Sequence, residues 1–163
     1  MRANEFKPGS LVELGGVKFI VLDTDDSDNT LYLYATAPQG VCSFKETDTY
    51  QNSELYEVMF SWLHEFIKAI GTKYLVMAEW DEDGEKFMDL CAPLPAYDAK
   101  KYLELIKPYA RGKGYMASFL LGHVQPKDVE PPIENRYHKK AGEPMKGGVR
   151  PALWINADIF TKE

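Results

Sequence analysis

One segment of this chain constrains the fold more than any other, because its apolar residues repeat with the period of an α-helix. Ser53 is a favourable N-cap residue, and acidic residues follow it in the first turn, where the helix dipole favours anions. Gly71 stands where a C-capping glycine belongs. Between them, apolar residues recur three and four positions apart on one helical face, namely Leu55, Val58, Met59, Trp62, Leu63, Phe66, Ile67 and Ile70. The pattern predicts a helix over residues 53–70 whose apolar face anchors the core.

Strand patterns lie on both sides of this helix. Apolar and alternating runs bounded by turn residues predict strands at 11–14, 17–23, 30–36, 73–80, 85–91 and 115–121. Glycines join the first two strands, and an acidic turn at 81–84 joins the fourth and fifth as a hairpin. Asp98 is the predicted N-cap of a second, shorter helix, and Pro108 is expected to end that helix. Strands and helices mix without regular alternation, so the predicted fold class is α+β, a compact single domain over residues 1–163 with an antiparallel sheet and two helices.

A long segment rich in proline and glycine, residues 123–148, precedes the core of the last predicted strand. A connection of this length without regular structure is uncommon, and such loops are usually functional or mobile. It contains Arg136, Tyr137 and His138 in the only dense basic run of the chain, RYHKK. A tyrosine among cations can contact a phosphate and a base, can pair with the acidic part of the chain, or can belong to a solvated loop tip.

Charge is distributed unevenly along the sequence. Residues 1–97 carry 17 acidic and 7 basic side chains, a balance of −10, whereas residues 98–163 carry 8 acidic and 12 basic side chains, a balance of +4. The net charge of −6 predicts no direct nucleic-acid binding, because phosphate contacts are made by lysine and arginine. An acidic surface attracts a protein partner with a basic surface, although it also simply keeps a protein in solution.

Two acidic turns concentrate this negative charge. Their carboxylates belong to Asp23, Asp25, Asp26 and Asp28 in the first turn and to Asp81, Glu82 and Asp83 in the second. The first turn, DTDDSDN, has oxygen ligands at alternate positions, as calcium loops do, but it lacks the glycine and the distal glutamate of an EF-hand. We therefore predict solvated turns without a bound metal, and these turns are the candidate surface for a protein partner.

No combination of residues in the sequence predicts catalysis. The histidines, His64, His123 and His138, do not stand at metal-ligand spacing with another histidine, a cysteine or a carboxylate. Cys42 and Cys91 lie in surroundings that are typical of small buried side chains. The glycine motifs that bind phosphates and the serine-hydrolase motif are absent from the sequence. The chain is therefore predicted to be a non-enzyme without a cofactor.

The end of the chain carries the motif GGVRPALWIN, residues 147–156. Its two glycines let the chain turn out of the preceding loop, and Pro151, which lacks an N–H, indicates a strand end or an edge. A period of two places Arg150, Ala152 and Trp154 on one face of the strand. If Arg150 is buried, it needs a carboxylate or several carbonyls to offset its desolvation. We predict a structural role for Arg150, Pro151 and Trp154.

Three segments resemble an uncharacterised family of small bacterial and phage domains. They are GGVKFIVLD at 15–23, NSELYEVMFSWLHEF at 52–66 and GVRPALWI at 148–155, in the family's order along the chain. The family's C-terminal pattern is similar to that of C-type-lectin-like domains, in which the last strand returns to pair near the N-terminal strands. The resemblance implies a compact α+β domain with neighbouring termini, used for binding more than for catalysis. At residues 115–122 the chain has YMASFLLG where the family has W-W-L-R-S, so a ligand site built from that segment does not carry over.

Two functional hypotheses follow. The first is a non-catalytic protein-binding domain of bacterial or phage origin that acts through its surface loops. The alternative is a phage-encoded, anti-CRISPR-like inhibitor of a host defence nuclease, in which acidic side chains mimic nucleic acid. An enzyme of the formylglycine-generating type shares the lectin-like architecture, but neither cysteine stands in that family's motif. No apolar run of membrane-spanning length and no signal-peptide layout is present, which predicts a cytoplasmic protein without a membrane partner, in the host cell if a phage encodes it.

Overall fold

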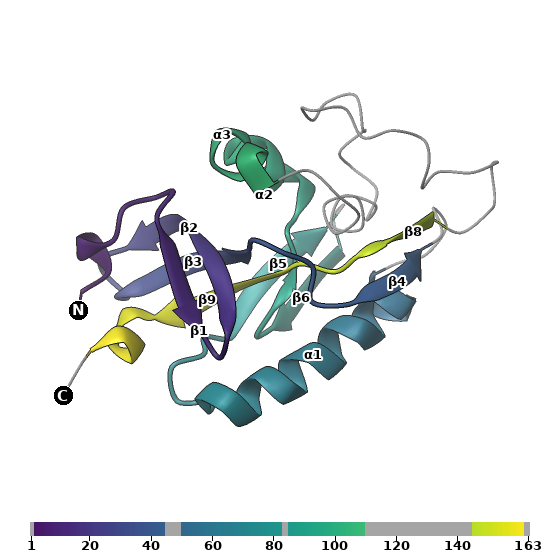
Figure 1. The fold of residues 1–163 in the computed structure, drawn as a ribbon, viewed down its shortest axis with the longest axis horizontal. Coiled ribbons are helices and arrows are strands. Elements are labelled where there is room, and N and C mark those ends of the chain that lie inside the picture. The colour runs from purple at the N-terminus through teal and green to yellow at the C-terminus, as the bar shows by residue number, and fades with distance from the viewer. Residues whose placement is uncertain (1, 45–49, 83–84, 110–144, 162–163) are drawn as a thin grey trace.

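A five-stranded antiparallel sheet forms the centre of the computed structural model, which describes residues 2–44, 50–82, 85–109 and 145–161 (Figure 1). In spatial order its strands are β1 (Leu11–Leu14), β2 (Val17–Asp25), β3 (Thr30–Ala35), β9 (Pro151–Asn156) and β7 (Ala92–Pro93). Two small antiparallel pairs accompany it, β4 (Val41–Phe44) with β8 (Met145–Gly148) and β5 (Ala78–Glu82) with β6 (Glu85–Asp89). The last strand of the chain therefore lies inside the sheet, between β3 and β7.

Helices lie on both sides of this sheet. In the described residues the α-helices are α1 (Glu54–Ile70), α2 (Ala96–Lys101) and α3 (Leu103–Ile106), and short 3-10 turns span Ala3–Glu5, Tyr50–Asn52, Lys107–Tyr109 and Ala157–Phe160. In Figure 1, α1 runs below the sheet, and α2 and α3 lie above it. An antiparallel sheet combined with helices in this way is the α+β class that the sequence predicts. Within the described ranges, every helix is too short or too polar to traverse a lipid bilayer.

Helix α1 begins and ends where the sequence predicts. The Ser53 hydroxyl oxygen accepts a hydrogen bond from the backbone N–H of Tyr56 (3.2 Å), which satisfies one of the donors left over in the first turn. Gly71 follows the helix with a positive φ of 78°, which glycine adopts without strain, and its N–H donates to the carbonyl of Ile67 (2.7 Å). The buried face of the helix consists of Leu55, Met59, Leu63 and Phe66.

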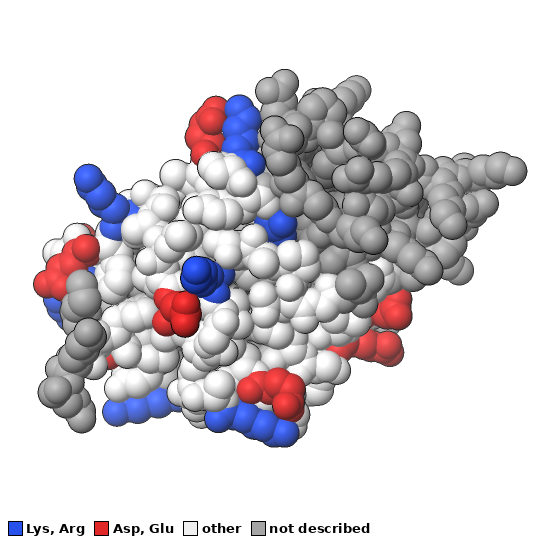
Figure 2. All heavy atoms as spheres, in the orientation of Figure 1, with Lys and Arg blue, Asp and Glu red and all other residues white. Residues whose placement is uncertain are grey.

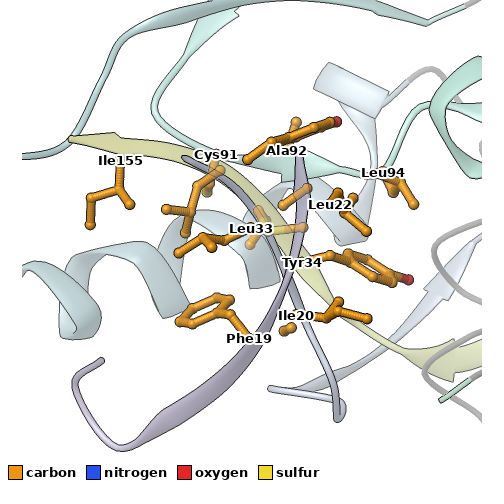
Figure 3. Packing of buried hydrophobic residues seen from close by; sticks show 14 of the residues in the cluster. Phe19, Ile20, Leu22, Leu33, Tyr34, Cys91, Ala92, Leu94 and Ile155 are labelled. Carbon is orange, nitrogen blue, oxygen red and sulfur yellow. The ribbon is translucent and has the colours of Figure 1, made fainter. Parts of the chain in front are cut away.

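The side of the sheet that faces α1 is apolar. Phe19 of β2 is fully buried and meets the ring of Phe66 edge-on, with the ring centroids 5.8 Å apart. Leu33 of β3 and Leu153 of β9 lie opposite each other on this side, and both are buried. Figure 3 shows side chains from β2, β3, β9 and the segment 91–94 meeting in one cluster. Burial of this apolar surface is the main source of the stability of the fold.

The two ends of the described chain lie side by side (Figure 1). The rings of Phe6 and Phe160 are in contact, with centroids 5.2 Å apart. Asn29 joins both ends, because its Oδ1 accepts from the N–H of Ala3 (2.7 Å) and its Nδ2 donates to Oδ1 of Asp158 (3.0 Å). The family resemblance implies neighbouring termini, and these contacts place the ends together.

The first acidic turn, DTDDSDN at residues 23–29, is shorter than the sequence indicates. Strand β2 continues to Asp25, because Thr24 pairs with Leu31 and Asp25 pairs with Thr30 on β3. A bulge between Val21 and Asp23 inserts one extra residue into β2. The acidic turn is consequently a tight connection between two paired strands and not a seven-residue loop.

The prediction for the second helix is wrong at its start and correct at its end, because the helical region ends with α3 at Ile106, before Pro108. Helix α2 starts at Ala96 with Pro95 as its N-cap, so Asp98 lies inside the first turn and does not cap it. Its carboxylate instead accepts a hydrogen bond from Tyr32 of β3. The helical region is also divided in two at Tyr102, and the chain passes Pro108 within a 3-10 turn that follows α3.

The hairpin predicted at 73–91 and the long loop predicted at 123–148 also differ from the structure. Hairpin strand β5 starts only at Ala78, because Leu75 forms a bridge with Ile155 and so belongs to the border of the main sheet. Residues 145–148, predicted as the end of the long loop, form β8. The rest of that loop, 123–144, and the strand predicted at 115–121 lie outside the described residues.

Candidate binding pocket

An open pocket of about 400 Å³ lies on the side of the sheet that faces away from α1. Its charged lining residues are Asp25 and Asp28, from the turn between β2 and β3. Thr30 and Asn156 contribute neutral polar groups, and Val76, Met77 and Ala78 form an apolar wall before β5. Trp154 of β9 completes the lining. Carboxylates, an indole and apolar side chains therefore meet in one concave surface, as is common in ligand sites.

Strand register explains why these residues meet. Across β2, β3 and β9, Asp25 lies opposite Thr30, and Thr30 lies opposite Asn156. Two positions further along, Asp23, Tyr32 and Trp154 form a second row on the same face, because side chains alternate along a strand. The first row lines the pocket; in the second row, Trp154 also lines it and Tyr32 stacks on the Trp154 ring.

The acidic turn is held by its own hydrogen bonds. Oδ1 of Asp25 accepts from the N–H of Ser27 (3.0 Å), from the hydroxyl of Ser27 (2.8 Å) and from the N–H of Asp28 (3.2 Å). The Ser27 hydroxyl bond is the main cause that lowers the pKa of Asp25, so this carboxyl stays ionised well below neutral pH. Asn29 follows with a φ of 56°, a left-handed conformation that asparagine tolerates, and is buried against both chain ends.

Trp154 is fixed beside the pocket by a stacked tyrosine. The rings of Trp154 and Tyr32 are parallel within 2°, with centroids 4.6 Å apart. Tyr32 is only 2% exposed and also touches the rings of Trp80 and Tyr102. The indole is itself half-buried, so it offers part of its surface to the pocket while Tyr32 prevents it from rotating away.

Two tyrosine–carboxylate bonds connect this aromatic cluster to the helices above it. The hydroxyl of Tyr32 donates to Oδ2 of Asp98 on α2 (2.7 Å), and the hydroxyl of Tyr102 donates to Oδ2 of Asp23 on β2 (2.7 Å). Burial raises the pKa of Asp98, and the nearby charge of Asp23 acts in the same direction, whereas the Tyr32 bond and Lys101 oppose it. Burial also raises the pKa of both tyrosines, so both remain hydrogen-bond donors at neutral pH.

The stability of the protein should depend on pH through Asp98. Because its pKa is raised in the folded state, the folded chain keeps this proton to a higher pH than the unfolded chain, and stability falls as the pH rises through that interval. The variant Asp98→Asn cannot ionise but can still accept the Tyr32 bond. We expect its stability relative to that of the native protein to increase as the pH rises above the ordinary aspartate pKa of 3.8, in urea unfolding measured at several pH values. A difference in unfolding free energy that stays constant with pH would contradict the assignment. Burial also raises the pKa of Asp89, but Asp89 titrates in both proteins, so its effect cancels in the comparison.

The structure separates the predicted partner-binding residues into groups. Asp25 and Asp28 line the pocket, and Asp26 is exposed on the same turn. Asp23 is half-buried and accepts a hydrogen bond from the Tyr102 hydroxyl, so it connects β2 to the end of α2. Asp81 is exposed on β5 opposite Lys86 and is not among the described lining residues of the pocket, and Glu82 ends that strand. Asp83, Arg136, Tyr137 and His138 lie outside the described residues.

The C-terminal motif combines a buried cation with the pocket tryptophan. Arg150 is 2% exposed, and its Nη1 donates to the carbonyl of Tyr109. Within the described ranges its Nε has no hydrogen-bond partner. Pro151 is the first residue of β9, a position where a strand tolerates a missing N–H. Trp154, predicted as structural, also lines the pocket.

Sequence reasoning missed the neutral and apolar part of the pocket. Thr30, Asn156 and the Val76–Ala78 wall come from three separate parts of the chain, and no local motif marks them. Alternation in TLYLYAT does place Tyr32 opposite the leucine face, which is the one signal that could have indicated an aromatic group there. Its partners, Trp154 and Asp98, are set by strand pairing and helix position.

The cysteines do not provide a reactive group. Cys42 and Cys91 are both buried, as predicted. Burial raises the pKa of Cys42 to about 12 and raises that of Cys91 as well, so both remain thiols at neutral pH. In the part of the chain that the structure describes, no three histidine, cysteine or acidic side chains gather closely enough to hold a metal ion.

Comparisons with protein-family models, with curated proteins and with solved structures each find no match. The family resemblance and the functions that it implies therefore remain predictions, and the pocket is interpreted from its own chemistry.

Proposed function

We propose that this chain is a protein-binding domain that engages a positively charged segment of its partner through the pocket beside Trp154. The observation that carries the proposal is the joint presence of two carboxylates and a half-buried tryptophan in one open pocket. Carboxylates attract a cation, and an aromatic ring adds a cation–π contact to it. A bacterial or phage origin and a C-type-lectin-like relationship belong to the same proposal.

Preorganisation supports binding at this place. The turn is held by Asp25 and Asn29, and the indole is held by Tyr32. A partner would therefore meet groups that are already in position, and less conformational entropy is lost on binding. Catalysis plays no part in this proposal, which rests on recognition alone.

Acidic mimicry of nucleic acid is the second candidate, and the acidic turn with Asp25, Asp26 and Asp28 favours it. Mimicry needs a continuous acidic surface, which the view in Figure 2 does not show, because basic and acidic side chains alternate over the described part of that face. Asp26 separates the two candidates, since it is exposed but does not line the pocket. The variant Asp26→Asn should weaken inhibition by mimicry and leave pocket binding unchanged.

Affinity capture with matched variants tests the proposal. The native chain and the double variant Asp25→Asn/Asp28→Asn are immobilised and exposed to a bacterial lysate, and retained proteins are identified by mass spectrometry. We expect at least one protein to be retained by the native chain, lost with the variant and released by added salt. The carboxamide oxygen introduced by Asp25→Asn can still accept the bonds of the turn, so the variant removes charge and keeps the fold.

A charge-matched control makes this outcome specific. The double variant Glu13→Gln/Glu65→Gln removes two exposed carboxylates from β1 and α1, away from the pocket residues. It should retain the same protein as the native chain. Equal loss with both variants would show that only net charge matters, and the pocket proposal would then fail.

A further inference from the structure

We propose that the pocket recognises the guanidinium group of an arginine side chain in preference to the ammonium group of a lysine. The inference rests on the proposed function, because it names the chemical group that the same pocket receives. It follows from three properties of the lining, which are its charge, its planar aromatic side chain and its apolar wall.

The charge of the pocket selects a cation. Among the described residues that line it, both charged side chains are carboxylates, Asp25 and Asp28. The three hydrogen bonds that hold the Asp25 carboxylate all end on Oδ1, so none of them occupies Oδ2. A guanidinium group carries five N–H donors in a fixed planar fork and can bond to two carboxylates at once. An ammonium group acts as a compact point charge with less directional demand.

The tryptophan favours a planar cation. Trp154 lines the pocket, and its ring is kept in place by the parallel ring of Tyr32 at 4.6 Å. Guanidinium groups stack on aromatic rings and are weakly hydrated, whereas ammonium groups hold their water strongly. An indole that cannot turn away is therefore a better partner for arginine than for lysine.

The apolar wall fits the stem of such a side chain. Val76, Met77 and Ala78 line the pocket next to Trp154, and Met77 is 54% exposed. The methylene groups of a long cationic side chain cover apolar surface while the charged head reaches polar groups. The volume of about 400 Å³ admits one long side chain together with part of its backbone.

Three peptides that differ in one side chain test the selectivity. Acetyl-Gly-Gly-X-Gly-Gly-amide with X as arginine, lysine or citrulline is titrated into the full chain by calorimetry at low ionic strength. We expect the arginine peptide to bind at least about fivefold more tightly than the lysine peptide. Citrulline keeps the planar shape but has no charge, so its peptide should show no measurable binding.

Variants of the lining identify the groups responsible. Asp25→Asn should weaken binding of the arginine peptide at least about fivefold. Trp154→Leu should remove the preference for arginine over lysine. Trp154→Phe retains a ring on Tyr32 and should keep most of the preference, which controls for a disturbed strand. The control Glu65→Gln on α1 should change nothing.

Each remaining outcome has a distinct meaning. Equal binding of the arginine and lysine peptides would overturn the selectivity and leave the proposed cation pocket standing. Binding of the citrulline peptide as tight as that of arginine would overturn the role of charge. If neither cationic peptide binds, or if binding is unaffected by Asp25→Asn, the proposed function fails together with this inference.

Discussion

Replacement of Phe66 by alanine is expected to lower the free energy of unfolding by about 3–5 kcal/mol, the range found when large aromatic side chains are removed from a core. Phe66 is 4% exposed on α1 and contacts both Phe19 of β2 and Trp62 on its own helix. Its removal leaves a cavity between the helix and the sheet, where the surroundings can relax only in part. Urea unfolding followed by circular dichroism measures the change.

Phe60 on the same helix provides the matched control. Its side chain is 59% exposed, and its ring contact is with Tyr56 on the same helix surface. Phe60→Ala should therefore change the unfolding free energy by no more than about 0.5 kcal/mol, as exposed substitutions usually do. Similar losses for the two variants would contradict the packing of α1 against β2.

Tyr32 should be the most sensitive residue on the opposite side of the sheet. Tyr32→Ala removes a buried ring that touches three other aromatic rings, and we expect a loss of about 3–5 kcal/mol. Tyr32→Phe keeps the ring but withdraws the hydroxyl from Asp98, which leaves a partly buried carboxylate with one donor fewer. That variant should lose about 1–3 kcal/mol.

The comparison of the two Tyr32 variants separates stacking from hydrogen bonding. Near-ultraviolet circular dichroism should change strongly in Tyr32→Ala, because Trp154 loses the ring that holds it, and only weakly in Tyr32→Phe. If the two groups interact, the change in unfolding free energy of the double variant Tyr32→Phe/Asp98→Asn should differ from the sum of the two single changes at the same pH. Additive changes would show that the bond contributes nothing measurable.

Local signals explain what the sequence predicts correctly. Helix α1 has a capping serine, a regular apolar stripe and a terminal glycine, all within one segment, and its bounds agree with the prediction. The hairpin of β1 and β2 likewise depends on neighbouring residues and a glycine turn. The α+β class follows from the order of these elements alone.

Contacts between distant segments explain what was missed. Asp98 has the sequence pattern of a helix cap, yet its carboxylate bonds to Tyr32, 66 positions earlier, and Pro95 takes the cap position. The two-residue strand β7 contains a proline and has no recognisable pattern of its own; it forms because β9 offers it a free edge. Local propensity cannot show which strand a distant segment meets.

The pocket was predicted only in part for the same reason. The acidic turn is visible in the sequence, because four aspartates fall within six positions. Trp154 follows more than 120 positions later, and it reaches the turn only because β9 pairs with β3 in the register that sets Trp154 opposite Tyr32. Pairing of remote strands therefore brings a charged turn and a structural motif together in one concave surface.

A chemical-shift map tests the central claim most directly. The ¹⁵N-labelled full chain is titrated with the peptide acetyl-Gly-Arg-Gly-Arg-Gly-amide, and the amide and indole N–H resonances are followed. We expect the largest changes at the Trp154 indole and at the amides of Asp25–Asn29 and Val76–Ala78, with saturation at one site. Changes confined to other surfaces, such as the hairpin around Asp81 and Lys86, or no change at the Trp154 indole, would contradict a cation-binding pocket at this place.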